Sequence, residues 1–205
     1  MITHKRTALI TGANSGIGLA TTKLLLSFDI EVIAHFRSDS RNLENINSDS
    51  LTILSADLSS DGEVTRLIND ISLHHIDILV NNAACYNYRD DFLTLTKQEI
   101  DEITSVNIVA PIRLSQTVLP SMINRSWGRI VNVSSISVAH GGSAATVDYT
   151  FSKSALESIT QSLAKKYAEH NVLINAVRVG VADTKIHQLN PQKDINERIA
   201  SIPIN

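Results

Sequence analysis

The stretch TGANSGIG spans Thr11 to Gly18 and follows directly on an apolar, strand-like run that begins at Thr7. Its three glycines meet three different backbone requirements. Gly12 would turn the chain sharply off the strand with a positive φ, Gly16 would leave room for a pyrophosphate at a helix N-terminus, and Gly18 would let that helix pack closely on a sheet. The spacing departs from the Gly-x-Gly-x-x-Gly pattern, so a glycine-rich turn without a ligand is the alternative interpretation.

Apolar, β-rich runs recur along the chain and alternate with segments of helical periodicity. The expected strands are Thr7–Thr11, Glu31–Phe36, Leu51–Ala56, Ile76–Asn81, Arg129–Ser134 and Val172–Val177. Apolar residues three or four apart predict the helices between them: Ile17, Ala20, Leu24 and Leu25; Val64, Leu67, Ile68 and Ile71; Ile100, Ile103, Val106 and Val109; and, within Tyr149–His170, Ala155, Ile159, Leu163 and Tyr167. This alternation predicts one doubly wound α/β domain over residues 1–205, with a parallel sheet between two helical layers.

The composition is that of an ordinary globular protein: of 205 residues, 43% are hydrophobic and 19% are charged. The net charge is −3 and no stretch concentrates Lys and Arg, which argues against nucleic acid and an anionic membrane surface as partners. No apolar run approaches the length of a membrane span, and Cys85 is the only cysteine, so no intrachain disulfide can form. We expect a cytoplasmic protein without a metal site.

The stretch YTFSK, Tyr149 to Lys153, places a phenol and an ammonium four residues apart on one helix face. A free tyrosine has a pKa of about 10, and a nearby positive charge stabilises the phenolate and lowers that pKa. An accidental surface pair is the alternative interpretation. Ser134 and Ser135 follow a predicted strand at the end where open α/β sheets bind ligands, although serines also commonly begin loops.

Taken in order, these motifs resemble those of the short-chain dehydrogenase/reductase family, with its 3-oxoacyl-acyl-carrier-protein reductases and glucose dehydrogenases. The resemblance covers nearly the whole chain and rests on Thr11–Gly18, Asp57–Leu58, Asn81–Ala83, Asn107, Ser134–Ser135, Tyr149–Lys153 and Asn175–Gly180. It implies a Rossmann fold and an enzyme that interconverts a carbonyl and a secondary alcohol of a small molecule by hydride transfer with a nicotinamide cofactor.

The resemblance also implies roles for individual residues. Tyr149 would be the proton donor in reduction and the base in oxidation, Lys153 would lower its pKa and bind the nicotinamide ribose, and Ser135 would hold the substrate oxygen. Asn107 would support a water chain toward Lys153. The remaining cofactor contacts would come from Gly12, Asn14, Ser15, Gly16, Ile17, Gly18, Phe36, Arg37, Asp57, Leu58, Asn81, Ala83, Gly180 and Thr184.

The end of the second strand indicates which cofactor is preferred. Enzymes that use NAD place a carboxylate there, on the ribose 2′-hydroxyl, whereas this chain has Phe36 followed by Arg37. No carboxylate would repel a 2′-phosphate, and a guanidinium pairs with it bidentately. We therefore expect a preference for NADP(H), with NAD(H) as the other candidate; a solvated Arg37 at a loop start is the alternative interpretation.

Some positions depart from the family pattern. Ala84 stands where the family has glycine, and Val179 where it has proline. The segment from Ser135 to Tyr149 is one residue longer than usual, which leaves both Ser135 and Ser137 as candidates for the substrate contact.

The C-terminal segment, residues 181–205, is polar and is interpreted as a substrate loop. His140, in the segment between Ser135 and Tyr149, is interpreted as an exposed loop residue. Family members continue with a further helix and a seventh strand, so we expect a shortened C-terminus and six strands. The resemblance also implies a homodimer or homotetramer through the helices around Ile100–Met122 and Tyr149–His170. A non-catalytic dinucleotide-binding sensor or scaffold is the second interpretation, and the identity of the substrate stays open.

Overall fold

Parallel strands form one six-stranded sheet in the computed structural model, which describes residues 5–182, 184 and 199–200. The strands are β1 (Thr7–Ile10), β2 (Glu31–Phe36), β3 (Leu51–Ser55), β4 (Ile78–Asn81), β5 (Gly128–Ser135) and β6 (Val172–Val179). They lie in the order β3-β2-β1-β4-β5-β6, and each neighbouring pair is parallel. This is the order of a doubly wound Rossmann fold, which confirms the predicted fold class. The predicted substrate loop lies mostly outside the described residues.

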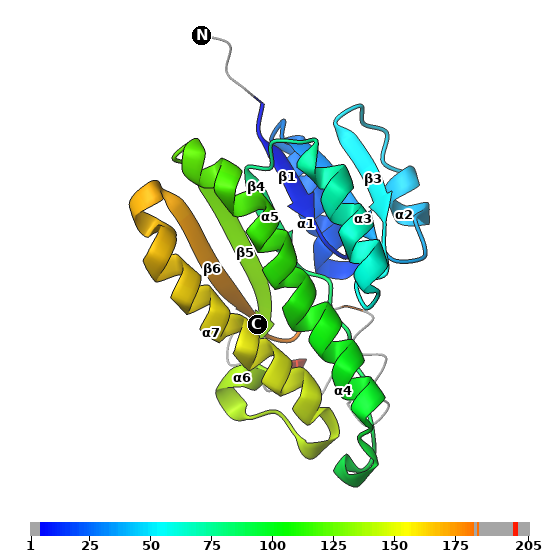
Figure 1. The fold of residues 1–205 in the computed structure, drawn as a ribbon. Helices are drawn as coiled ribbons and strands as arrows, with labels where there is room; N and C mark the ends of the chain where they lie inside the picture. The colour runs from blue at the N-terminus through cyan, green and yellow to red at the C-terminus, as the bar shows by residue number, and fades with distance from the viewer. Residues whose placement is uncertain (1–4, 183, 185–198, 201–205) are drawn as a thin grey trace.

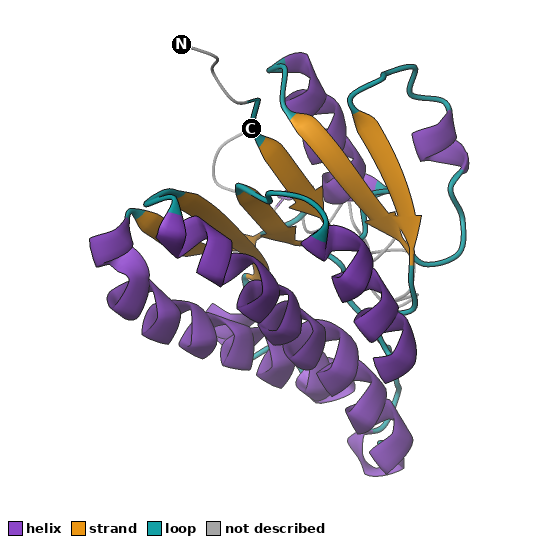
Figure 2. Ribbon diagram, turned by 45° about the horizontal axis from the view of Figure 1, so that its top comes forward, coloured by secondary structure: helices purple, strands orange, loops and turns teal. Residues whose placement is uncertain are grey.

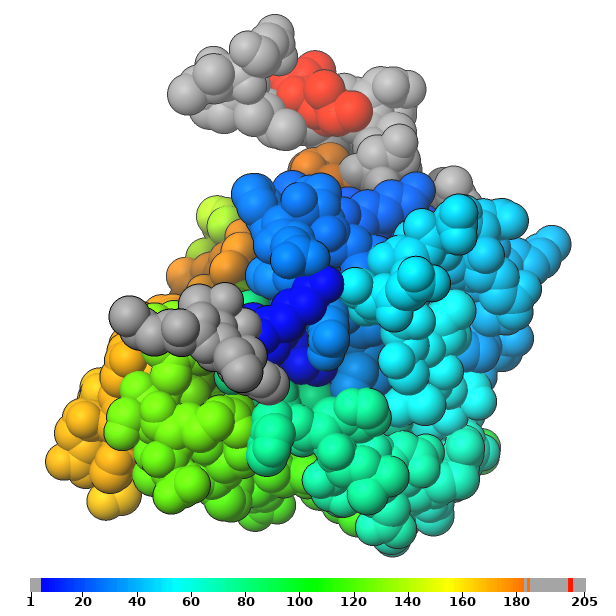
Figure 3. Space-filling view, turned by 90° about the horizontal axis from the view of Figure 1, so that it is seen from above, coloured from blue at the N-terminus to red at the C-terminus, as the bar shows by residue number. Residues whose placement is uncertain are grey.

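Helices cover both faces of the sheet (Figures 1 and 2). They are α1 (Gly16–Ser27), α2 (Arg41–Glu44), α3 (Asp61–Ser72), α4 (Lys97–Thr104), α5 (Ala110–Asn124), α6 (Ser137–His140) and α7 (Val147–Tyr167), with 3-10 turns at Phe92–Thr94, Ala144–Thr146 and Ala168–His170 and a π-helical turn at Ser105–Val109. Helices α3, α5 and α7 lie on one face and α1 on the other. The start of β1 is visible between these layers when the molecule is seen from above (Figure 3).

Strand residues alternate between two apolar cores, because successive side chains of a strand point to opposite faces. Leu9 belongs to a core with Leu67 of α3 and Leu114 of α5. The next residue, Ile10, belongs to a second core against which Leu25 of α1 packs. Both strand residues are fully buried. Since both faces of the central strands are covered, these strands are continuous apolar runs in the sequence.

The buried face of α1 differs from the predicted one. The predicted stripe was wrong at Ala20 and Leu24, which are exposed; the buried residues are Gly18 and Thr22. A Cβ atom built at Gly18 would lie 2.2 Å from the carbonyl oxygen of Gly12. The helix therefore touches the preceding turn at Gly18, and this contact decides which face of α1 meets the sheet. For α3 the predicted stripe is confirmed, with buried residues Val64, Leu67 and Ile71.

The helix predicted around residues 100–109 is interrupted by the π-helical turn. Pro111, near the start of α5, has no N–H, and its ring opposes the carbonyl of the residue four positions earlier, Asn107. The regular hydrogen-bond pattern therefore cannot continue across this turn. Ile103 is fully buried, whereas Ile100 and Val109, predicted on the same stripe, are 36% and 42% exposed. The π-helical turn shifts the helical phase between Ile103 and Val109. The same turn places Asn107 in the interior.

Candidate active site

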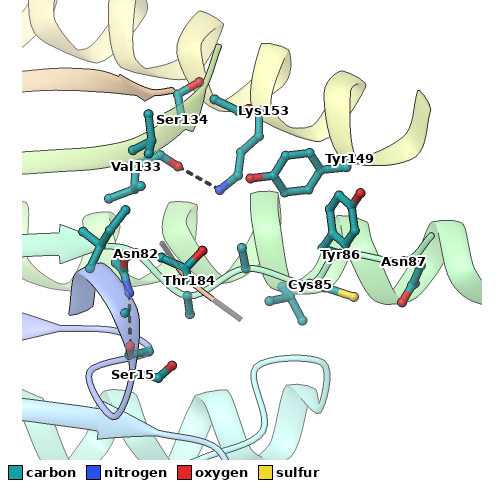
Figure 4. A pocket seen from close by; sticks show the side chains of 18 of the residues that line it. Ser15, Asn82, Cys85, Tyr86, Asn87, Val133, Ser134, Tyr149, Lys153 and Thr184 are labelled. Carbon is teal, nitrogen blue, oxygen red and sulfur yellow. Dashed lines mark hydrogen bonds between the residues drawn. The ribbon is translucent and has the colours of Figure 1, made fainter. Parts of the chain in front are cut away.

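A cavity of about 700 Å³ lies at the carboxyl ends of the strands, beside β1 and β4, where the strand order reverses. Open α/β sheets bind ligands at this position, and cofactor sites have this volume. Figure 4 shows residues of the glycine turn at one end of the cavity and residues of α7 at the other end. The wall of the cavity contains most of the predicted site residues: Gly12, Asn14, Ser15, Gly16, Ile17, Arg37, Asp57, Leu58, Ala83, Ser135, Tyr149, Lys153, Gly180 and Thr184.

Four other predicted site residues are not among the described residues that line the cavity: Gly18, Phe36, Asn81 and Asn107. Gly18 is the contact point between α1 and the glycine turn, and Phe36 packs against the apolar core on the α1 side. Asn81 is 2% exposed and donates from Nδ2 to Oδ1 of Asn132 at 2.8 Å. These residues hold the site's framework; Phe36 and Asn81, both predicted to contact the cofactor, are not among the described residues that line the cavity.

The glycine turn has the geometry that its sequence predicts. Gly12 has a φ of +64° and Gly16 a φ of +50°, and a Cβ at Gly12 would lie 2.9 Å from Cα of Ala83. Asn82, which the sequence reasoning missed in favour of its neighbour, fixes the turn by donating from Nδ2 to the carbonyl oxygens of Thr11 at 2.8 Å and Gly12 at 3.1 Å. Only glycine tolerates this conformation and this close approach together.

The N-terminus of α1 faces the cavity with free donors. Its N-cap, Ser15, makes no side-chain capping bond within the described part of the chain, and no acidic residue lies in the first turn. The first N–H groups of a helix have no partner within the helix, and the helix dipole adds a partial positive charge there. This cradle fits the pyrophosphate of a dinucleotide. The side chain of Thr184 lies beside the cradle, 3.1 Å from where a Cβ atom on Gly16 would be.

The other strand ends bring charged groups to the same end of the cavity. Arg37 is exposed and lines the wall just after β2. Asp57 follows β3, and hydrogen bonds from Ser59 hold the pKa of its carboxyl below the usual range, with a smaller contribution from the charge of Arg37. His35 of β2 also lines the cavity; sequence reasoning missed it because a histidine inside a strand carries no motif.

Tyr149 and Lys153 project from the first turns of α7 into the opposite end of the cavity, with the tyrosine hydroxyl directed toward the lysine (Figure 4). Burial raises the pKa of Tyr149 to about 12; a hydrogen bond with Ser135 acts in the opposite direction, and Tyr86 adds to the increase. The net shift of this pKa is therefore upward, opposite to the lowering that was expected from Lys153. The phenol therefore keeps its proton at neutral pH.

The environment of Lys153 explains that result. The side chain is 1% exposed, and burial lowers its pKa to about 8 because water no longer stabilises the charge. Its Nζ donates to the carbonyl oxygen of Val133 at 2.8 Å and lies 5.7 Å from the centroid of the Tyr149 ring. The amine is thus held by β5, and burial of the phenol outweighs its influence.

Both candidate serines line the cavity. Ser135, at the end of β5, forms the hydrogen bond that lowers the pKa of Tyr149, and its Oγ accepts from the N–H of Ser137 at 3.2 Å. The Oγ of Ser137 is buried and has no hydrogen-bond partner among the described residues. The geometry thus places Ser135 beside the phenol and Ser137 in the adjoining wall.

Asn107 makes its hydrogen bonds away from Lys153. Its Oδ1 accepts from the N–H of Cys85 at 2.7 Å, and its Nδ2 donates to the carbonyl oxygen of Cys85 and to Oγ of Ser152, each at 3.0 Å. The fully buried amide therefore fastens the segment after β4 to α7. That segment brings Tyr86, which no motif indicates, edge-on to Tyr149, with ring centroids 5.1 Å apart. His140 was predicted to be an exposed loop residue; it is exposed, but it ends the short helix α6, and it also lines the cavity.

No helix among the described residues is long and apolar enough to cross a membrane. A family model described as short chain dehydrogenase matches residues 6–194.

Relatives and solved structures agree with that match. The chain is 32% identical to the 3-oxoacyl-[acyl-carrier-protein] reductase FabG of Rickettsia prowazekii, over 97% of this chain and 82% of the relative. A 3-oxoacyl (acyl-carrier-protein) reductase of Agrobacterium tumefaciens with NADP bound superposes with a TM-score of 0.80 at 30% identity, covering 89% of this chain and 72% of that one. A 4-hydroxyisoleucine dehydrogenase complexed with NADH superposes with a TM-score of 0.82 at 29% identity, covering 91% and 79%.

Proposed function

The chain belongs to the short-chain dehydrogenase family and is an oxidoreductase, and on this premise we propose that it reduces a carbonyl group to a secondary alcohol with NADP(H). One observation carries the proposal: a protonated, buried phenol, a serine hydroxyl and a buried amine meet at one end of a cavity whose other end is an anion cradle at the start of α1. The bound nicotinamide would supply the hydride.

The residues of α7 and β5 would supply the proton and the polarisation. Tyr149 donates its phenolic proton to the carbonyl oxygen as the alkoxide forms, and Ser135 donates a hydrogen bond to the same oxygen. With the pKa of Tyr149 at about 12, the phenol carries the proton that reduction requires throughout the neutral range. Lys153 stabilises the phenolate left behind, and Val133 holds its amine in place through the 2.8 Å hydrogen bond.

The preference for NADP(H) is supported by the residues at the end of β2. Arg37 lines the cavity and is exposed, so its guanidinium can pair with a 2′-phosphate. Asp57 lines the same end of the cavity as Arg37 and interacts with its charge. A 2′-phosphate would have to compete with the Asp57 carboxylate for the guanidinium of Arg37. Related structures hold NADP in one case and NADH in another, so affinity has to be measured for this chain.

The test is a panel of ketones and 3-oxoacyl thioesters, followed by NADPH absorbance and compared with NADH. Wild-type protein should turn over at least one of them and bind NADPH with a lower Kd than NADH. Tyr149→Phe should lose about 10²–10⁴-fold in kcat with the Kd for NADPH kept, since only the proton donor is removed. Tyr167→Phe is the matched control, because Tyr167 packs against the core at the end of α7. NADPH binding without turnover by any compound, or an active Tyr149→Phe variant, contradicts the proposal.

We also propose that the protein forms a homodimer or homotetramer through the helices around Ile100–Met122 and Tyr149–His170. Val109, in the π-helical turn before α5, is 42% exposed and Phe151 of α7 is 39% exposed, and a contact between two copies would remove these apolar side chains from water. Light scattering coupled to size exclusion tests this, and a monomer at micromolar concentration would contradict it.

A further inference from the structure

His35 joins three separate segments at the base of the glycine turn. It lies in β2 and is 2% exposed. Its Nδ1 accepts from the N–H of Gly12 at 3.3 Å, and its Nε2 lies 2.9 Å from the carbonyl oxygen of Ala56, just beyond β3. Its own carbonyl oxygen accepts from the N–H of Ala13 at 2.8 Å. One residue thus binds two successive N–H groups of the turn that begins the cradle.

These contacts allow a single protonation state. A carbonyl oxygen only accepts, so Nε2 must carry the hydrogen that bonds to Ala56. A backbone N–H only donates, so Nδ1 must be bare to accept from Gly12. The imidazole is therefore neutral. A second proton could only be added at Nδ1, where it would point at the N–H of Gly12 and replace a hydrogen bond by two opposed donors.

The charges around His35 come from few groups. Burial lowers the pKa of His35, while the hydrogen bond to Ala56 and the charge of Asp57 act in the opposite direction. Arg37, on the same strand, interacts with Asp57. Beyond Arg37, the side chains of Asp39 and Arg41 pair with each other through two hydrogen bonds, and the N–H of Arg41 also donates to Asp39. Neither β1 nor the glycine turn contains a titratable side chain.

We infer that His35 is a positioning residue whose neutral imidazole holds the glycine turn in the shape that receives a dinucleotide, and whose protonation at Nδ1 releases it. The inference rests on the proposed function, because it concerns the affinity of the same cradle. It goes further in assigning a pH-dependent role to a residue that has no contact with the reacting atoms. The expected effect is a weaker dinucleotide affinity in acid, by about tenfold for one lost hydrogen bond to the partly buried N–H of Gly12.

Two variants separate the two hydrogen bonds of the ring. In His35→Asn, the amide oxygen can occupy the place of Nδ1 and accept from Gly12, and it does not titrate. In His35→Gln, the longer side chain can reach the place of Nε2 and donate to Ala56, but it leaves Gly12 without an acceptor. The Kd for NADP⁺ and for NAD⁺ is measured by calorimetry from about pH 7.5 to about pH 5.

Wild type should weaken in acid by about tenfold more than His35→Asn; the comparison cancels the titration of the ligand's own 2′-phosphate. His35→Gln should bind about tenfold more weakly than wild type at neutral pH. Parallel pH profiles for wild type and His35→Asn, or wild-type affinity in His35→Gln, overturn the inference. Failure of wild type to bind either dinucleotide at any pH would instead refute the proposed function.

A second measurement needs no variant. Amide hydrogen exchange of the free wild-type protein should show the protection factor of Gly12 falling as His35 is protonated, as followed by the NMR shifts of its ring. The neighbouring amide of Ala13 bonds to the main chain of His35 and should stay protected. Equal protection of Gly12 on both sides of the His35 titration would also overturn the inference.

Discussion

Arg89 and Asp148 form a buried ion pair that connects the segment after β4 to the first turn of α7, next to Tyr149. Two guanidinium nitrogens of Arg89 lie 3.0 Å from the two carboxylate oxygens of Asp148. The side chains are 5% and 0% exposed. One of the carboxylate oxygens also accepts from the N–H of Tyr149 at 2.9 Å. The perturbation that tests this pair is Arg89→Met, which keeps an unbranched, somewhat shorter side chain and removes the charge.

The expected cost follows from the burial of the partner that is left behind. Removing one member of a buried pair leaves an unpaired charge and typically costs about 3–5 kcal/mol. For a protein of this size, that lowers Tm by about 6–20 °C. Adding Asp148→Asn to Arg89→Met removes the stranded charge but keeps the acceptor for Tyr149, so the double variant should be more stable than the single one by at least about 1 kcal/mol.

Urea denaturation followed by circular dichroism measures these differences, with an exposed pair as the matched control. Lys97 and Asp101 are 86% and 59% exposed, so Lys97→Met should change the free energy of unfolding by less than about 1 kcal/mol. If Arg89→Met costs no more than Lys97→Met, or if Asp148→Asn makes it worse, the reasoning from burial is refuted.

Two further predictions concern the glycine turn and the buried amine. Gly18→Ala should destabilise the protein by several kcal/mol and abolish dinucleotide binding, because the new Cβ atom would lie 2.2 Å from the carbonyl oxygen of Gly12. The control is Gly62→Ala, whose Cβ atom would have no described atom within 4 Å and which should stabilise α3 by about 0.5–1 kcal/mol. Equal effects of the two substitutions in thermal melts would contradict this reasoning. The pKa of Lys153 is about 8 in the folded protein and 10.5 ordinarily, so between these values the unfolded chain binds the proton more tightly than the folded one. The free energy of unfolding of the wild type should therefore rise by up to about 3 kcal/mol from pH 8 to pH 10.5, relative to that of Lys153→Met. Parallel curves of stability against pH for the two proteins would refute this prediction.

The architecture could be predicted because its signals are local. Each strand of a doubly covered parallel sheet is a short apolar run, and each glycine of the turn answers a requirement of its own backbone. The six strands, the positive φ of Gly12 and the stripe of α3 follow from such patterns. The buried face of α1 did not follow from the apolar pattern, because the close contact between Gly18 and the carbonyl of Gly12 sets which face of the helix meets the sheet.

The sequence by itself determined that a phenol and an amine lie on one face of a helix, since a spacing of four residues is about one helical turn. Only the tertiary structure decided what these groups do: Val133 holds the amine, and burial raises the pKa of Tyr149 to about 12. It also brought His35 to Gly12, a partner 23 positions away. The physical reason is that burial and charge pairing depend on neighbours in space, which a local pattern of residues does not specify.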